Sequence, residues 1–207
     1  STFSADGDGI VISEGIAMIA MKRLADAERD GDRIYSVIKG VGGSSDGYAK
    51  GLTAPLPAGQ LRAMRRAYAQ AGFGPADVQL FEAHGNVTVA GGTAELESTT
   101  RLIDEAGGKP HQAAIGSVKT LIGHTKAAAG VSGLLKAAMA LHHRVLPPHG
   151  NTPNPNAILR QDTSPLYLLD EPQPWLEAPD GAPRRAAVSA FGFGGTNATL
   201  VFSKYKG

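Results

Sequence analysis

The sequence predicts an α/β protein in which helices and strands pack in layers around one core. Strand-like apolar runs alternate with helical patterns, and short glycine-rich turns separate them. Hydrophobic residues make up 42% of the 207 residues, which is enough to build a core, and the 19% of charged residues argues against disorder. No internal repeat or change in composition marks a second domain.

The first sixty residues are predicted to form two strands separated by a short helix. A mainly apolar strand is expected at 10–21. Residues 22–33 hold eight charges in twelve positions, which favours a solvated helix that ends near Gly31. The alternating, β-branched residues 33–40 predict the second strand, and a loop rich in Gly, Ser and Pro follows at 42–57.

The remainder of the chain alternates between the two kinds of element. Helices are predicted at 59–71, 93–106 and 126–142, and the last is apolar on nearly all sides, so we expect it to be buried. Strands are predicted at 78–81, 113–118, 166–169, 186–190 and 199–202. A loop with four prolines occupies 147–155.

Composition narrows the function classes. The formal net charge of +1 gives no field strong enough to indicate nucleic acid or an anionic membrane as a partner. The chain has no cysteine, so neither a disulfide framework nor a thiolate zinc site is expected, and we expect no metal. No apolar run is long enough to span a bilayer and no secretory signal is visible, so we expect a cytoplasmic location. The chain opens in mid-pattern at Ser1, as a fragment or processed product does.

Two histidines stand where α/β proteins place chemistry. His84 follows the strand 78–81, and the carboxyl ends of such strands are where open sheets build their sites; both a catalytic and a structural role are open for it. Lys119 and His124 flank the turn before helix 126–142, whose dipole would lower the pKa of His124 and favour neutral imidazole. A helix cap beside a surface lysine explains the same residues equally well.

The glycine-rich run AFGFGGTNA at 190–198 contains two phenylalanines. Such a run can cradle phosphate, but this one lies between two predicted strands rather than at the start of a helix, which argues against a P-loop.

In their order along the chain, several strings resemble the signatures of β-ketoacyl synthases, the condensing enzymes of fatty acid and polyketide synthesis. The clearest are EAHG at 82–85, GSVKTLIGHTKAAAG at 116–130 and FGFGGTNA at 191–198. DGIVISEG at 8–15, SSDG at 44–47 and TAP at 53–55 also fit that family, so the resemblance covers essentially the whole chain. Within the family, the chain is most similar to ketosynthases of multidomain synthases that make polyketides, polyunsaturated fatty acids or long-chain glycolipids.

The resemblance implies a thiolase-like fold, in which two similar halves with mixed sheets pack around a shared helical layer. Residues 1–45 would be the end of the N-terminal half, and residues 46–207 the C-terminal half. A cysteine on the N-terminal half takes the acyl chain in this family, so a Cys-bearing partner segment is implied, because this chain has none. The resemblance also implies acyl carrier protein as a partner, substrates carried on its phosphopantetheine, no tightly bound cofactor, and a homodimer of the completed domain.

The family mechanism assigns roles to residues of the matching motifs. His84 and His124 would bind the thioester carbonyl of a malonyl-type extender, promote its decarboxylation and stabilise the enolate. Lys119 would order them, paired with a carboxylate for which Glu95 is the candidate. Supporting and substrate-binding roles are implied for a further set: Phe191, Phe193 and Gly194 in the gating loop, and Thr88, Asn86 and Thr53 along the pantetheine arm.

The sequence departs from the family pattern after the first histidine. The usual run is HGTGT followed by a Gly-Asp pair, whereas this chain has Asn86, Val87 and Thr88, and then Gly91-Gly92. Asn86 alters one pantetheine contact, Val87 is strained if that position needs a positive φ, and Gly92 removes an acidic residue near Lys119.

Four functions therefore compete. The first is an active condensing enzyme completed by its Cys-bearing half. The second is a non-elongating ketosynthase that binds and passes on acyl chains, which the altered loop favours. A thiolase-like enzyme acting on coenzyme A esters is disfavoured, because thiolases use a second cysteine in this half. A structural α/β domain with incidental histidines is disfavoured by the clustered motifs.

Overall fold

The computed structural model describes residues 2–7, 9–47, 54–85, 88–150, 152–178, 180–192 and 195–206. Its central feature is a six-stranded mixed sheet with the strand order β1-β8-β7-β2-β3-β5. The strands are β1 (Val37–Ser45), β2 (Leu80–Glu82), β3 (Ala113–Gly116), β5 (Leu166–Tyr167), β7 (Arg185–Gly192) and β8 (Thr196–Ser203). Neighbours among β1, β8 and β7 run antiparallel, and β2, β3 and β5 continue the sheet in parallel from β7.

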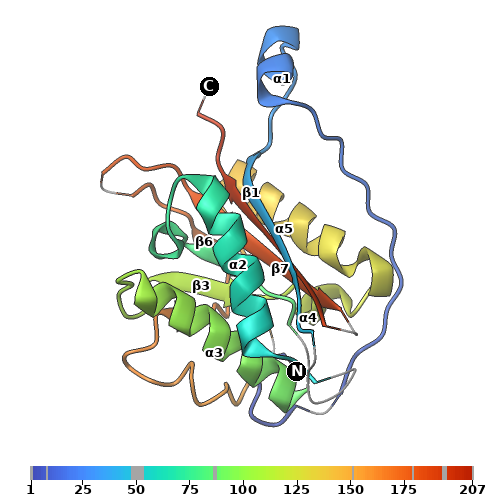
Figure 1. Ribbon diagram of the computed structural model, residues 1–207, viewed down its shortest axis with the longest axis vertical. Coiled ribbons are helices and arrows are strands. Elements are labelled where there is room, and N and C mark those ends of the chain that lie inside the picture. Colours follow the sequence, from blue (N-terminus) through green and yellow to red (C-terminus); the bar gives the residue numbers. More distant parts are fainter. Residues whose placement is uncertain are drawn as a thin grey trace.

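Helices cover both faces of this sheet (Figure 1). One face carries α2 (Pro57–Ala71) and α3 (Val89–Glu105), and the other carries α5 (Ala129–His143). The remaining elements are α1 (Leu24–Asp30), α4 (Lys119–Ile122), two 3₁₀ turns (Pro75–Asp77 and Lys126–Ala128), and a small ladder of β4 (Val145–Leu146) and β6 (Gln173–Pro174). This confirms the predicted α/β layers.

The core has two parts, one on each face of the sheet. Successive residues of a strand point to opposite faces, so Phe81 and Ile115 join α2 and α3, whereas Leu80 and Ala114 join α5. The mainly apolar sequences of these inner strands follow from that double burial.

Strand β1 lies where the sequence analysis expected a strand followed by a loop. It begins at Val37 rather than at residue 33 and continues to Ser45, inside the predicted loop. Its glycines allow α2 to pack directly on the strand: a Cβ at Gly40 would lie 2.0 Å from the carbonyl oxygen of Ala67, and one at Gly42 would lie 2.0 Å from that of Ala63. The glycines that looked like loop signals are thus required for close contact between helix and strand.

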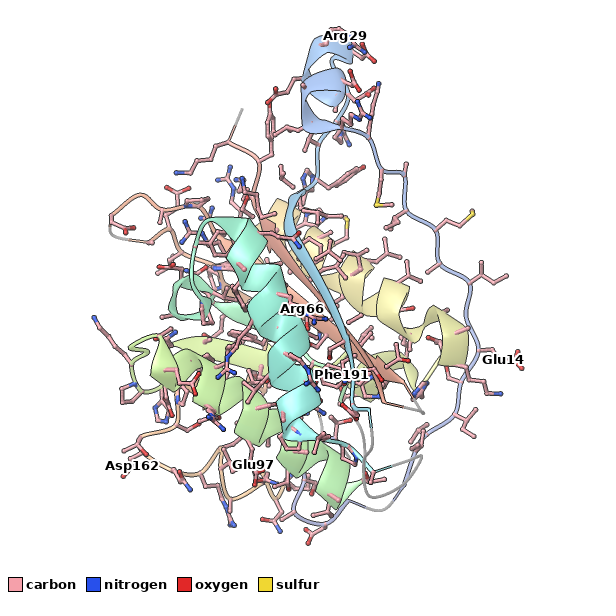
Figure 2. The ribbon with its side chains drawn as sticks, viewed as in Figure 1. Glu14, Arg29, Arg66, Glu97, Asp162 and Phe191 are labelled. Atoms are coloured by element: carbon pink, nitrogen blue, oxygen red, sulfur yellow. The ribbon has the colours of Figure 1, made fainter. Side chains whose placement is uncertain are left out.

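The predicted strand at 10–21 was wrong. This segment is extended and runs along the outside of the molecule, and a single bridge between Ile12 and His124 is its only strand-like pairing among the described residues. Its apolar side chains are not buried: Ile16 is 95% and Met18 is 85% exposed. Figure 2 shows these side chains standing away from the core, with Glu14 at the outer margin.

The positions of the helices agree with the predicted ranges better than their burial does. α1 ends at a left-handed Gly31, as expected, and α3 begins at Val89, four residues earlier than predicted, because Thr88 caps it. The expectation that the apolar third helix is buried holds for one side of it: α5 buries one stripe of mostly small residues, and Met139 on another side is 38% exposed. Among the described residues, no helix has the length and apolar character needed to cross a membrane.

Candidate functional site

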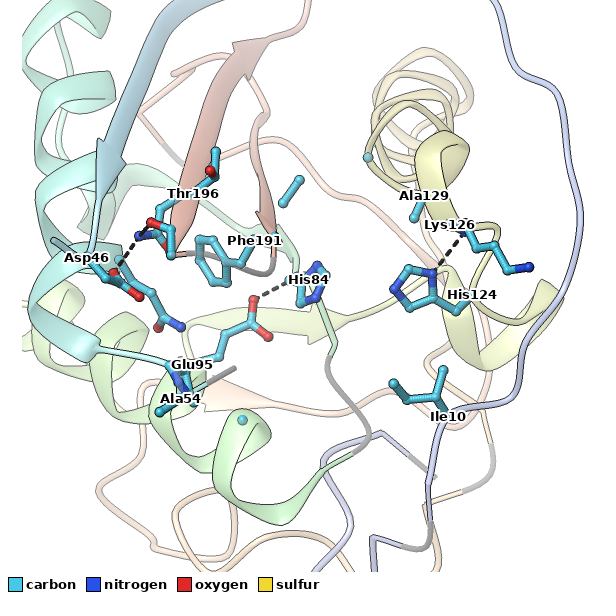
Figure 3. Close-up of a pocket in the computed structure, with 18 of the residues that line it drawn as sticks. Ile10, Asp46, Ala54, His84, Glu95, His124, Lys126, Ala129, Phe191 and Thr196 are labelled. Atoms are coloured by element: carbon cyan, nitrogen blue, oxygen red, sulfur yellow. Dashed lines mark hydrogen bonds between the residues drawn. The ribbon is translucent and has the colours of Figure 1, made fainter. Parts of the chain in front are cut away.

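One cavity of about 500 Å³ opens where one end of the sheet meets the starts of three helices (Figure 3). His84 and His124 both line it, and so do the start of α3, the start of α5 and the turn between β7 and β8. Ile10, from the extended segment, and Phe191, from the end of β7, close two of its sides. The two histidines that the sequence analysis singled out therefore face one common cavity.

His84 is held in place through its backbone. It lies two residues beyond β2, and its N–H donates to Glu95 Oε1 at 2.7 Å. The next N–H, of Gly85, donates to Glu95 Oε2 at 2.9 Å, and Gly85 has a φ of 64°, which a side chain would strain. The buried carboxylate of α3 thus fixes the turn that carries the first imidazole.

Lys119 contacts His84 rather than a carboxylate. Its Nζ lies 3.3 Å from His84 Nδ1 and also donates to the His84 carbonyl oxygen. The expected ion pair with Glu95 does not form within the described part of the chain: the Glu95 oxygens accept from backbone N–H groups, and Glu95 acts on Lys119 through its charge without pairing with it. Lys119 begins the short helix α4.

His124 faces His84 across the cavity, with the ring centroids 6.0 Å apart and the ring planes at 83°. Its Nδ1 accepts from the backbone N–H of Lys126 at 3.0 Å. Its own backbone N–H donates to the carbonyl oxygen of Val11 at 2.7 Å, and its carbonyl oxygen accepts from Ser13 N–H. The extended segment at 10–21 therefore anchors the second imidazole, a role that its apolar sequence does not reveal.

Burial sets the protonation of this site. It lowers the pKa of His84 to about 3, and the positive charge of Lys119 and the neighbouring His124 act in the same direction. Burial also lowers the pKa of His124, with the positive charge of Lys119 as the second cause. Burial lowers the pKa of Lys119, which Glu95 and Glu82 oppose, and raises that of Glu95 to about 7. Both imidazoles are neutral near pH 7.

The hydrogen bonds fix which imidazole nitrogen carries the proton. An ammonium group has only donors, so beside a charged Lys119 the Nδ1 of His84 accepts and its Nε2 carries the hydrogen. The Nδ1 of His124 accepts from Lys126 N–H, so its Nε2 carries the hydrogen as well. Neither Nε2 has an acceptor among the described residues, so each can donate to a group that enters the cavity.

The other predicted site residues have varied positions. The Phe191 ring lies 5.7 Å from the His84 ring, between centroids. The Thr88 hydroxyl accepts from Gly91 N–H at 3.1 Å as the N-cap of α3, so part of its bonding is structural. Four predicted residues lie outside the described residues: Thr53, Asn86, Phe193 and Gly194.

Three largely buried polar residues beside the site have no predicted role. Glu82 accepts from Val118 N–H at 2.5 Å and pairs with Lys136 at 2.8 Å. His149 accepts from Ser117 N–H at 3.3 Å through Nδ1, and its Nε2 lies 3.1 Å from the carbonyl oxygen of Thr2. A lysine within an apolar helix and a histidine within a proline-rich loop were the available signals.

Comparisons with known proteins agree on one family. Residues 35–152 match the model of the β-ketoacyl synthase C-terminal domain. A polyunsaturated fatty acid synthase polypeptide from Thraustochytrium is 46% identical over 201 residues, which are 95% of this chain and 7% of that protein. Polyketide synthase PksL of Bacillus subtilis is 42% identical over 204 residues, which are 99% of this chain and 4% of that protein.

Solved structures give the same result. The ketosynthase from module 6 of the bacillaene synthase of Bacillus subtilis superposes with a TM-score of 0.85 at 44% identity, over 89% of this chain and 33% of that one. The ketosynthase from module 1 of the Bacillus amyloliquefaciens bacillaene synthase gives a TM-score of 0.90 at 34% identity, over 100% of this chain and 36% of that one. The chain thus spans about a third of the solved ketosynthases and has their thiolase-like fold. It belongs to the β-ketoacyl synthase family, as the C-terminal domain of a ketosynthase of the polyketide and fatty acid synthase type.

Proposed function

We propose that this chain supplies the decarboxylating half of a β-ketoacyl synthase, which condenses a malonyl-type extender with an acyl chain. The observation that carries the proposal is the pair of neutral imidazoles, 6.0 Å apart between ring centroids, with both Nε2–H groups available to one cavity.

This arrangement suits the formation of an enolate from a malonyl thioester. The bond from the α-carbon to the carboxylate breaks and CO₂ leaves. The electron pair of the broken bond moves to the thioester oxygen and forms the enolate. Two preorganised donors in a buried site stabilise that oxyanion as its charge develops. Neutral imidazoles serve better than imidazolium ions here, because they donate hydrogen bonds without transferring a full proton to the enolate.

Condensation then needs an acyl group on a nucleophile. The α-carbon of the enolate attacks the acyl carbonyl carbon, and a thiolate leaves. None of the 207 residues is a cysteine, so we propose that the thiol comes from a Cys-bearing N-terminal segment, with residues 1–45 as the end of that half. Acyl carrier protein would deliver both substrates on phosphopantetheine, and the completed domain would be a homodimer. We expect His84, His124 and Lys119 to act in the chemistry, and Thr88, Asn86 and Thr53 to contact the arm.

A second candidate function is acyl transfer without elongation. Gly92 lies buried in α3 with no side chain, and Lys119 makes no ion pair in the described part of the chain. A site in which Glu95 and Glu82 act on Lys119 through their charge but form no ion pair with it would stabilise the enolate less, and the chain would then bind and pass on acyl groups.

The test is release of CO₂ from malonyl-acyl carrier protein by the full protein that carries this chain. Replacing His84 or His124 by Ala is expected to slow decarboxylation by about 10²- to 10³-fold each, as for the loss of an oxyanion donor. His143→Ala is the matched control, because His143 is exposed at the end of α5. Wild-type rates in both active-site variants would exclude the proposal, and acyl transfer without CO₂ release or extended product would favour the second candidate.

A further inference from the structure

A buried carboxylate joins the three elements that build the site. Glu82 is 2% exposed at the end of β2, two residues before His84. Its Oε1 accepts from the backbone N–H of Val118, at 2.5 Å, and its Oε2 accepts from Lys136 Nζ on α5, at 2.8 Å. A carboxylate has four lone-pair directions, and both oxygens of this one are engaged in a charge-assisted hydrogen bond.

Local packing is shaped around this carboxylate. Gly133 of α5 lies against it, and a Cβ there would lie 3.1 Å from Glu82 Cγ and 3.4 Å from Oε1. Lys136 is one helical turn further on, which brings its Nζ to the same carboxylate on the face of the sheet that α5 covers. The side chain of Lys136 is 10% exposed and that of Glu82 is 1% exposed, so the pair is screened from solvent.

The Val118 bond connects Glu82 to Lys119. Val118 immediately precedes Lys119 and is the N-cap residue of α4. Lys119 in turn contacts both Nδ1 and the carbonyl oxygen of His84. The path from Glu82 through Val118 and Lys119 returns to His84, two residues beyond Glu82, and so forms a closed ring of contacts.

The stability of the fold does not by itself explain why a buried ion pair is present here. Burying two charges costs more than their attraction regains in many proteins, and apolar replacements of similar size are often neutral or stabilising. A pair that is neutral for stability but fixed in geometry is suited to holding a neighbouring group in register.

We propose that Glu82 and Lys136 are positioning residues for the decarboxylation step: Lys136 orients the Glu82 carboxylate, and the carboxylate holds Val118 so that Lys119 stays on His84. This inference rests on the proposed function. Lys119 is required on Nδ1 because that contact makes Nε2 the hydrogen donor toward the enolate oxygen. A displacement of about 1 Å at this point is enough to lower the rate by about two orders of magnitude.

The experiment compares two uncharged variants that differ in one hydrogen bond. In Glu82→Gln with Lys136→Met, the amide oxygen can still accept from Val118 N–H. In Glu82→Met with Lys136→Met, a side chain of similar length cannot. The first double variant keeps the acceptor but loses the lysine that orients it, and is expected to lose up to about threefold in the kcat for decarboxylation. The second loses both and is expected to lose at least about tenfold in kcat with little change in KM.

A second readout follows the histidine directly. Lys119 and His124 are the charged or titratable side chains that influence His84, and burial is the larger effect. If Lys119 moves away in the methionine double variant, the His84 pKa rises from about 3, which NMR titration of the labelled imidazole in the full chain detects. The two double variants are compared over the pH range in which both remain folded, because unfolding would also raise this value. If the methionine variant does not fold, Glu82→Asn with Lys136→Met takes its place, since the shorter amide does not reach Val118.

One control and two contrary outcomes distinguish the positioning role of Glu82 and Lys136 from the proposed decarboxylating function. Glu105→Gln removes a carboxylate from an exposed cluster with Arg65 and Arg101, and is expected to change neither readout. Equal kcat values and an unshifted His84 titration in the two double variants overturn the positioning role, even if His84→Ala abolishes decarboxylation. If His84→Ala decarboxylates at the wild-type rate, the proposed function itself fails.

Discussion

At the level of single residues, Lys119 adds to the effect of burial on the protonation of His84. Its cation disfavours a second positive charge on the ring, so replacing Lys119 by Met is expected to raise the His84 pKa from about 3 by at least about one pH unit. Burial remains, so the value should stay below the ordinary 6.5. NMR titration of the labelled ring checks this. Lys126→Met is the control, because Lys126 contacts His124 only through its backbone N–H; an equal shift in both variants would contradict the assignment.

His149 makes a second, purely structural prediction about pH. Burial lowers its pKa to about 4, although the bond to Thr2 opposes the shift. The unfolded chain takes up this proton near pH 6.5 and the folded chain does not, so the stability that neutral His149 contributes is present above pH 6.5 and is lost as the pH falls toward 4. The whole loss is roughly 3 kcal/mol.

The measurement is the free energy of unfolding in urea for wild type and His149→Gln, at several pH values. Glutamine does not titrate, so the stability advantage of wild type over the variant should shrink between about pH 7 and pH 4. Glu95 has a raised pKa of about 7 and changes stability in the opposite direction, but it is present in both proteins and cancels in the difference. A gap that stays constant with pH would show that His149 is not held neutral.

At the level of elements, the contact between β1 and α2 depends on glycine. A Cβ at Gly42 would lie 2.0 Å from the carbonyl oxygen of Ala63 and 2.5 Å from the nitrogen of Ala67. Gly42→Ala is therefore expected to force helix and strand apart and to lower the free energy of unfolding by about 1–3 kcal/mol. Gly43→Ala is the matched control, since its Cβ would meet nothing closer than 3.7 Å. Equal stability of the two variants in urea titrations would contradict this packing.

The same strand marks the limit of what local sequence predicts. The one-sided apolar pattern of α2 located that helix, and α5 was located from a run that is apolar on nearly all sides. Short apolar runs located β7 and β8. The local pattern misread 42–45, where glycines serve packing between elements, and it misread 10–21, where an apolar segment finds no neighbouring strand in the sheet. Both errors arise because pairing and close approach depend on distant residues.

The candidate site shows the same division. His84 and His124 are forty positions apart, and that spacing alone does not predict that their ring centroids lie 6.0 Å apart. Their proximity was expected only because the sequence resembles ketosynthases. An ion pair of Lys119 with Glu95 was expected, but the Glu95 oxygens bind two backbone N–H groups, which the sequence cannot reveal, and Glu95 acts on Lys119 through its charge. Glu82 and Lys136 become a pair only once β2 and α5 lie on each other.

At the level of the whole molecule, the segment 10–21 presents apolar side chains that the described residues do not cover. Ile16, Met18 and Met21 are 95%, 85% and 73% exposed, and the same segment holds His124 through Val11 and Ser13. Contiguous exposed apolar surface marks an interaction site, and its attachment to a proposed catalytic residue links that interaction to the chemistry. We therefore expect the Cys-bearing segment to cover it.

Ile16→Asp with Met18→Asp tests this expectation. Each apolar side chain that is buried on association contributes about 1.5–3 kcal/mol, so the double variant should weaken binding of a separately supplied Cys-bearing segment by at least about tenfold. Leu176→Asp is the control, because Leu176 is 78% exposed and follows β6, which lies across the sheet from the extended segment in Figure 1. Titration calorimetry gives the affinities. Wild-type affinity in the double variant would mean that the partner segment covers another face. Residues 10–13 would then hold His124 in place without help from the partner segment.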